Sequence, residues 1–161
     1  MSDRVLLPFV DAWSVDIEAP PRTVWQVLLE SQPPAHAGGW RRALAMALGA
    51  DPAVANGLGA HVIGAERPGF EVREVVAPAT YALAGQHRFA RYQLVYRISQ
   101  RGAHQSRLTA ETFASFPGPA GRLYRALVID ARLHALVMWI TVRVLRTRAE
   151  ARARREQAHH A

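Results

Sequence analysis

The chain has 161 residues, carries a formal net charge of +7 and contains no cysteine. This length is typical of one domain, and the absence of cysteine excludes disulfides, thiolate nucleophiles and cysteine-bound metal clusters. All twenty Lys and Arg positions are arginine, which excludes Schiff-base chemistry on lysine and a phosphate loop that needs its lysine.

Neither a signal peptide nor a membrane span is predicted. The apolar run at residues 5–7 follows a single basic residue and lacks a small-residue cleavage site. A span needs about 18 uninterrupted apolar residues. The best apolar stretch, residues 126–145, is interrupted by Asp130, Arg132, His134 and Arg143. We therefore expect a cytoplasmic protein with a single domain over residues 1–161 and a core from about 11 to 148.

The first third of the chain predicts one strand and two short helices. Residues 11–18 alternate between apolar and polar side chains, with Trp13, Val15 and Ile17 on one face. Pro20 and Pro21 end that strand, and proline suits the first turn of the helix that follows. The next proline pair, at 33 and 34, ends this helix, and residues 40–48 predict a second one.

The middle of the chain predicts an antiparallel meander. Strand-like segments near residues 60–66, 69–77, 80–86, 88–99 and 105–116 are separated by turn signals at Pro68-Gly69, Pro78, Gly85 and Gly102. Such short connections favour antiparallel pairing, because parallel strands need long crossovers.

One long helix is predicted over residues 121–156. Its apolar stripe consists of Leu123, Leu127, Leu133, Leu136, Val137, Ile140 and Val144. A helix of this length spans about 54 Å, more than the roughly 40 Å diameter of a compact domain of this size. We therefore expect residues 149–161 to form an arginine-rich, frayed end. Whether His159 and His160 are native is left open.

The arginines at this end have two readings. Residues 143–161 hold six arginines and two glutamates. A solvated helix end, complementing the negative pole of its dipole, is favoured. Weak contact with an acidic membrane stays open, whereas no nucleic-acid partner is expected, since no basic motif lies on the folded body. The sequence does not define an oligomeric state.

Together the elements predict an α+β fold: a strand, two short helices, an antiparallel meander and a long C-terminal helix. An antiparallel sheet with one apolar face must cover it, and the terminal helix is the largest apolar element left to do so. Small residues on the inner face would leave room for a cavity between sheet and helix.

A family resemblance agrees with this fold. Residues 13–25, with an alternating strand followed by Ala19-Pro20 and Val24-Trp25, resemble the opening of START-like proteins of the SRPBCC superfamily. Residues 83–92 and 121–125 resemble an uncharacterised bacterial branch of it. The resemblance implies a helix-grip fold that binds a small hydrophobic or amphipathic ligand, as a carrier or sensor. An enzyme of the polyketide cyclase or dehydratase type is the alternative that the superfamily implies.

Candidate ligand contacts follow from the faces of the predicted elements and from this resemblance. The polar candidates are Arg88, Tyr92, Tyr124 and His134, and the apolar lining is expected from Leu94, Tyr96, Leu108, Leu127 and Val137. Guanidinium suits recognition of a carbonyl or carboxylate. Two structural alternatives stay open: Arg88 and its neighbour His87 satisfy the carbonyls of a turn, and the tyrosines are core aromatics with a wet tip.

If the protein is an enzyme, His134 and His87 are the candidate general bases. His134 lies four residues after Asp130, so one helical turn brings the two side chains together. A hydrogen-bonded core histidine is the alternative. Glu111 is expected either in the cavity beside an arginine or in a surface pair with Arg97. The scattered histidines show no metal-ligand spacing, so neither a metal nor a cofactor is expected.

Overall fold

The computed structural model describes residues 7–32, 40–130 and 132–159. Its elements in chain order are β1 (Phe9–Ile17), α1 (Pro21–Glu30), α2 (Trp40–Leu48), β2 (Glu66–Arg67), β3 (Phe70–Val76), β4 (Thr80–His87), β5 (Ala90–Gly102), β6 (Gln105–Ser115), α3 (Gly118–Arg125), a π-helical segment (Ala126–Asp130) and α4 (Leu133–Ala158).

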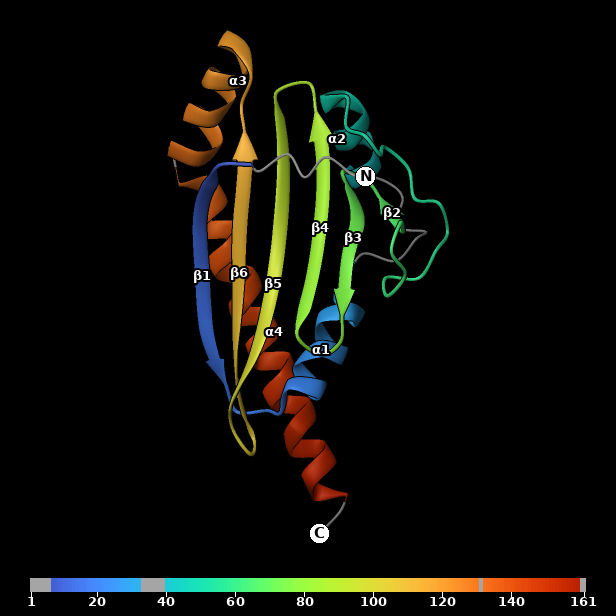
Figure 1. The fold of residues 1–161 in the computed structure, drawn as a ribbon, viewed down its shortest axis with the longest axis vertical. Coiled ribbons are helices and arrows are strands. Elements are labelled where there is room, and N and C mark those ends of the chain that lie inside the picture. Colours follow the sequence, from blue (N-terminus) through green and yellow to red (C-terminus); the bar gives the residue numbers. More distant parts are fainter. Residues whose placement is uncertain (1–6, 33–39, 131, 160–161) are drawn as a thin grey trace.

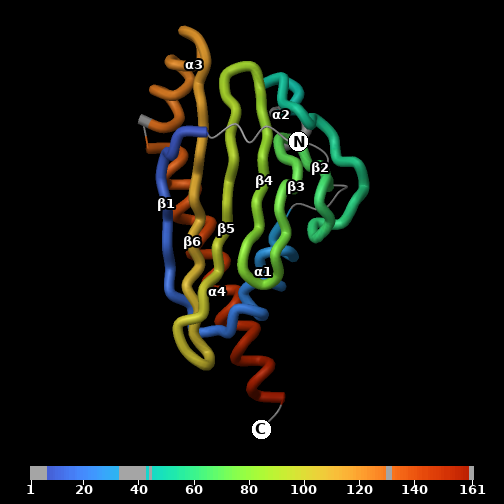
Figure 2. The backbone as a smooth tube through the Cα atoms, viewed as in Figure 1, coloured from blue at the N-terminus to red at the C-terminus, as the bar shows by residue number. Residues whose placement is uncertain are grey.

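The strands form a six-stranded antiparallel sheet in the order β1-β6-β5-β4-β3-β2. Consecutive strands pair as a meander, and the first strand joins at the edge beside the last. α1 and α4 lie on one side of the sheet, behind it in Figure 1, and the tube in Figure 2 shows the same arrangement. The predicted α+β helix-grip fold is confirmed.

Two glycine-rich stretches of the meander differ from the prediction. Residues 60–65 form turns, and β2 is only two residues long, because Gly57 and Gly64 both adopt a positive φ that interrupts extended pairing. Gly85, predicted as a turn, lies inside β4. A Cβ there would overlap the carbonyl oxygen of Gly69, so this glycine permits a close approach of two backbones.

The core lies where α1 and α4, from Met138 onward, cover the sheet, and its largest fully buried side chains include Tyr81, Ile17, Leu28, Leu108 and Val24. On α1, Trp25 packs edge-to-face on Tyr81 with ring centroids 6.1 Å apart. Apolar residues from α1, α4 and five strands therefore form one closed cluster.

The C-terminal helix is interrupted, which the predicted single helix over residues 121–156 missed. α3 passes into the π-helical segment, and Arg132, with a φ of 61°, adopts the left-handed conformation just before α4 begins. This conformation is uncommon for a non-glycine residue and separates the two helices. The phase of α3 therefore does not carry over into α4.

The predicted inner stripe lies on the outward side of the C-terminal helices. All seven residues of the expected inner stripe are between 41% and 64% exposed, and the buried residues of α4 are Met138, Val142, Leu145, Ala149 and Ala153. Val137 and Val142 are five residues apart, about 140° around a helix of 3.6 residues per turn. Leu127 and Val137 therefore lie on the outer side, 63% and 53% exposed, and not in a lining between helix and sheet.

The C-terminal half of α4 is held in place, contrary to the expected frayed end. The helix continues to Ala158, and Ala149 and Ala153 are fully buried where α4 packs against α1. Small side chains allow two helices to approach closely. His160 lies outside the described residues.

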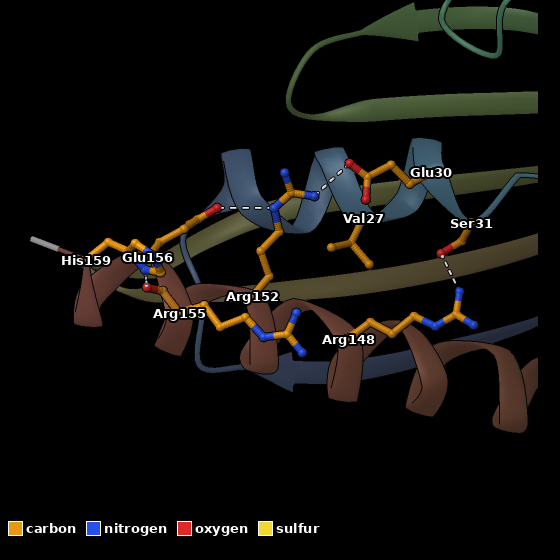
Figure 3. Close-up of a pocket in the computed structure, with 8 residues that line it drawn as sticks. All are labelled: Val27, Glu30, Ser31, Arg148, Arg152, Arg155, Glu156 and His159. Atoms are coloured by element: carbon orange, nitrogen blue, oxygen red, sulfur yellow. Dashed lines mark hydrogen bonds and ion pairs between the residues drawn. The ribbon is translucent and has the colours of Figure 1, made fainter.

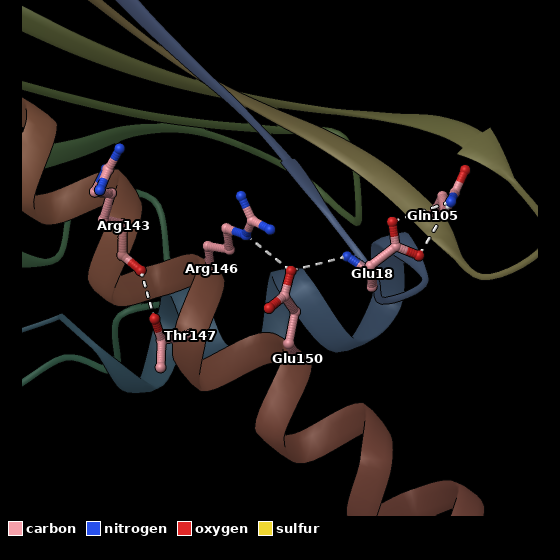
Figure 4. A network of polar contacts seen from close by, with 6 residues as sticks. All are labelled: Glu18, Gln105, Arg143, Arg146, Thr147 and Glu150. Carbon is pink, nitrogen blue, oxygen red and sulfur yellow. Dashed lines mark hydrogen bonds and ion pairs between the residues drawn. The ribbon is translucent and has the colours of Figure 1, made fainter.

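Polar contacts also fix this half of the helix (Figure 4). Glu150 Oε1 accepts hydrogen bonds from the backbone N–H of Glu18, at 3.3 Å, and from Arg146 Nε, at 2.9 Å. The Glu18 carboxylate in turn accepts from Gln105 Nε2 at 3.0 Å. The end of β1 and the start of β6 are thereby tied to α4. Within the described ranges, no helix combines the length and apolarity needed to span a membrane.

Candidate functional site

A polar group lies where the first turn of α4 meets β1 and β6. His134 Nε2 is 3.1 Å from Thr112 Oγ1 and 3.5 Å from Asp11 Oδ1. The His134 and Asp11 side chains are only 22% and 25% exposed. Asp11 Oδ2 accepts a hydrogen bond from Trp13 Nε1 at 3.1 Å, but the buried Oδ1 has no hydrogen-bond donor among the described residues.

Asp11 was missed as the partner of His134. The sequence prediction named Asp130, whose side chain lies outside the described residues. Asp11 comes from the other end of the chain, and the pairing of β1 with β6 brings it to Thr112. One signal was available: Asp11 has the same parity as Trp13 and Ile17, so the alternation of β1 places its carboxylate on the apolar face.

Leu94 connects the polar group to the apolar face. In the sheet register Asp11 is opposite Thr112, and Thr112 is opposite Leu94. Leu94 is opposite Leu83 of β4. These four residues form one row across four strands, all on the face toward α4. Leu94 is only partly buried, whereas Leu83 belongs to the closed core.

Aromatic rings gather one row further along the sheet, where Tyr92 of β5 is opposite Ala114 of β6. The His87 ring is 5.5 Å from that of Tyr92 and 4.9 Å from that of Tyr124 on α3. Phe89, in the turn between β4 and β5, stacks on Tyr124 at 5.5 Å. We call His87, Phe89, Tyr92 and Tyr124 the aromatic cluster; it joins α3 to the sheet.

Burial shifts the pKa of three members of the aromatic cluster, His87, Tyr92 and Tyr124. It lowers the pKa of His87 below its usual value, so the imidazole is neutral at pH 7, and Nδ1 accepts a hydrogen bond from the Phe89 N–H at 3.2 Å. It raises the pKa of Tyr92 to about 12, with a smaller contribution from Tyr124. The Tyr92 hydroxyl donates to the Gly69 carbonyl at 2.6 Å.

Arg88 and Glu111 make the structural contacts that the sequence analysis left open as alternatives to a binding role. Arg88 is exposed, and its Nη2 donates to the Ala47 carbonyl at the end of α2, at 2.7 Å. Glu111 pairs with Arg97, its Oε2 being 3.0 Å from Arg97 Nε. Glu111 lies on the face of β6 opposite to that of Thr112, because neighbouring residues of a strand alternate.

Tyr96 and Leu108 are in the closed core. Leu108 is fully buried, and Tyr96 is 5% exposed, with burial raising the pKa of its hydroxyl to about 12. The structure brings Asp11, Thr112 and His134 together in one group. It brings the four rings of the aromatic cluster together in another.

 The row that starts at Asp11 and the cluster around Tyr92 therefore define the candidate site.

Two hollows are described, and both lie elsewhere. One, of about 590 Å³, is a groove between α1 and the C-terminal half of α4 (Figure 3). Ion pairs and hydrogen bonds cross it: Arg152 pairs with Glu30 at 2.6 Å and Arg148 donates to Ser31 at 3.4 Å. The other, of about 320 Å³, lies near Asp16 and the β5–β6 hairpin. The predicted cavity between sheet and helix is neither of these. No cluster of three or more metal-ligating side chains occurs in the described part of the chain.

Comparisons with known proteins return similar folds only. Neither a family model nor a curated protein matches the sequence. A conserved protein from Geobacillus kaustophilus matches 89% of this chain and 94% of its own, at 16% identity and a TM-score of 0.49. Norcoclaurine synthase from Thalictrum flavum matches 84% of this chain and 85% of its own, at 12% identity and a TM-score of 0.49. CalU16 from Micromonospora echinospora matches 87% of this chain and 83% of its own, at 15% identity and a TM-score of 0.43. At these values no ligand or reaction carries over, and the helix-grip architecture rests on the sheet order and helix placement described above.

Proposed function

We propose that the protein binds a small apolar or amphipathic molecule between the sheet and the first turn of α4, as a carrier or sensor. The observation that carries the proposal is the buried Asp11 Oδ1, which makes no hydrogen bond within the described residues, lies 3.5 Å from His134 Nε2 and belongs to the same row as the partly buried Leu94. Buried polar atoms normally have a partner, and a ligand hydroxyl would supply one. The bacterial START-like branch and a cytoplasmic location remain part of this proposal.

The side chains favour a particular ligand chemistry. A carboxylate only accepts hydrogen bonds, so Asp11 favours a hydroxyl or amine over an acidic group. The ligand's apolar body would lie against Leu94 and Tyr92, which are two residues apart along β5, or about 7 Å. This spacing fits a molecule of about two fused rings with one donor group.

A pair of matched probes tests this chemistry. 2-Naphthol has the donor, and 2-methoxynaphthalene has nearly the same rings without it. Calorimetric titration should give about tenfold or more tighter binding of 2-naphthol, the range expected for a hydrogen bond to a charged group. Asp11→Leu should abolish this preference. Asp16→Leu, on the exposed face of the same strand, should keep it. Equal affinity of both probes for the wild-type protein, or no binding of either, would contradict the proposal.

Filling the apolar part of the site gives a second test. Leu94→Trp adds bulk where the rings of the ligand are proposed to lie, so both probes should lose most of their affinity. Arg91→Trp introduces the same side chain at an exposed position of β5 and should leave both affinities within about twofold. Unchanged binding to Leu94→Trp would place the probes elsewhere on the molecule.

A second candidate function is an enzyme of the cyclase or dehydratase type. The 3.5 Å separation of His134 Nε2 from Asp11 Oδ1 favours it, because a carboxylate beside an imidazole holds the ring in a fixed orientation. 2-Tetralone in deuterated water tests it, since a base would exchange the hydrogens next to its carbonyl. Exchange that the wild type accelerates and His134→Gln does not would support the enzyme. No acceleration by the wild type would leave the carrier as the supported function.

A further inference from the structure

The outward face of the C-terminal helices exposes large apolar side chains. On α4, Leu133, Val137, Ile140 and Val144 recur at helical spacing, and we call these four the outer stripe. They are 41% to 55% exposed, and Leu123 and Leu127 add exposed side chains on the preceding segments. Residues three and four apart are neighbours on a helix surface, so the outer stripe is continuous. A continuous exposed apolar patch of this kind marks an interaction site.

The charges that accompany the outer stripe are mostly positive. Residues 112–145 contain four arginines, at positions 122, 125, 132 and 143, and one acidic residue, Asp130. All four arginines are exposed. Arg143 lies over the ring of Trp139, with its Cζ 4.3 Å from the ring centroid, and Trp139 is itself 40% exposed. An apolar stripe accompanied by arginine and tryptophan complements a surface that is apolar inside and negative at its boundary.

We propose that the outer stripe docks on the surface of an anionic lipid bilayer. The stripe spans 12 residues, from Leu133 to Val144, or about 17 Å along the helix axis, which suits a helix lying in the plane of the membrane. Its aliphatic side chains would enter the boundary of the acyl chains. Arginine stems extend to the lipid headgroups, and each basic residue near an anionic surface strengthens the attachment.

A second copy of the chain fits the outer stripe less well. The spacing of four, three and four resembles a coiled-coil seam, but it covers fewer than the three or four heptads that a stable coiled coil needs. A symmetric dimer through this face would also bring the arginines of both copies together, because both subunits use the same patch. The proposal uses the side of α4 that faces away from the sheet and does not depend on the proposed ligand site.

Vesicle sedimentation tests the proposal with the whole chain. The wild type should bind vesicles of phosphatidylcholine with phosphatidylserine, bind pure phosphatidylcholine much more weakly, and dissociate as salt is raised. Ile140→Glu should weaken binding at least tenfold, and Arg143→Gln about fivefold. Ile63→Glu, at an exposed apolar position outside the outer stripe, is the matched control and should bind like the wild type. Thermal melting checks that each variant is folded.

Each other outcome overturns the proposal. Absent binding to anionic vesicles, equal binding to neutral ones, or undiminished binding of Ile140→Glu would do so. A wild-type dimer that Ile140→Glu converts to a monomer, measured by light scattering without any vesicle binding, would assign the outer stripe to a second copy. Leu94→Trp should still bind vesicles, so a failure of the ligand site and a failure of the membrane contact are distinguishable.

Discussion

The two ends of the grip between sheet and helices differ in how they are packed. At one end, α1 and the C-terminal half of α4 enclose a closed core around Leu28, Leu108 and Tyr81. At the other, α3 and the first turn of α4 leave Tyr92, Leu94 and His134 only partly buried. One sheet therefore provides both a stable core and a less enclosed face. The difference indicates that stability and binding are assigned to different rows of the same strands.

β6 shows this division within a single strand. Leu108 is fully buried in the core, and Thr112, four residues later on the same face, contacts His134. Both positions lie on the same strand and the same face, and they differ in which helical segment covers them. Substitutions in the two rows should therefore affect different measurements.

The largest expected effect is on stability at the closed end. Leu108→Ala should lower the free energy of unfolding by about 2–5 kcal/mol, because it leaves a cavity in a packed core. Leu94→Ala should cost less than about 2 kcal/mol, since part of that side chain is already exposed. Urea denaturation measures both. Equal losses for the two variants would remove the distinction between the ends.

Alkaline titration should affect both ends. Burial raises the pKa of Tyr81, Tyr92 and Tyr96 to about 12, above the usual 10. These tyrosines bind their protons more tightly when folded, so the stability they contribute is complete below pH 10 and is lost as the pH rises toward 12. Tyrosinate absorbance should therefore appear together with unfolding. Tyr96→Phe should reduce the alkaline loss of stability; tyrosines that ionise near pH 10 in the folded protein would contradict this.

Mild acid should lower the stability contributed by the aromatic cluster, by less than alkaline pH lowers that contributed by the tyrosines. Burial lowers the pKa of His87, so below about pH 6.5 the unfolded chain takes up its proton before the folded one does. The stability contributed by neutral His87 is present above pH 6.5 and is lost as the pH falls through the lower folded pKa. His87→Phe should reduce this acid-dependent loss in denaturation measured at about pH 7 and pH 5. An exposed-site control, His104→Gln, should retain it.

The smallest expected effect is at the surface pair. Glu111→Gln should change the free energy of unfolding by no more than about 1 kcal/mol, since exposed ion pairs contribute little. The affinity for 2-naphthol should remain that of the wild type, because Glu111 lies on the other face of the sheet. A loss of probe affinity in this variant would show that the site extends to the face of Arg97.

The strands and their faces could be predicted from the sequence, whereas the helix faces could not. Alternation along β5 and β6 correctly grouped Tyr92 with Leu94 and Leu108 with Thr112, because a period of two is robust as long as the strand is continuous. α4 carries two apolar stripes, one with Val137 and Ile140 and one with Met138 and Val142. Periodicity alone does not show which stripe faces the sheet, so Val137 was assigned to the wrong side. Leu127 lies in the π-helical segment, where the period of 3.6 residues does not hold.

The candidate site was predicted only in part. His134, Tyr92 and Tyr124 were named from their places on predicted elements, and the structure brings Tyr92 and Tyr124 into one aromatic cluster. The pairing of His134 with Asp11 depends on how β1 aligns with β6, which local periodicity does not determine. Contacts between the two ends of a chain follow from tertiary packing, so spacing favoured the nearby Asp130 instead.

The most direct test of the account is a backbone amide NMR titration with 2-naphthol. The account predicts that the largest shift changes lie at Asp11, Leu94, Thr112 and His134, with smaller ones in the aromatic cluster. Changes confined to the outer stripe, or to the groove between α1 and the C-terminal half of α4, would contradict the assignment of the ligand to the less enclosed face of the sheet.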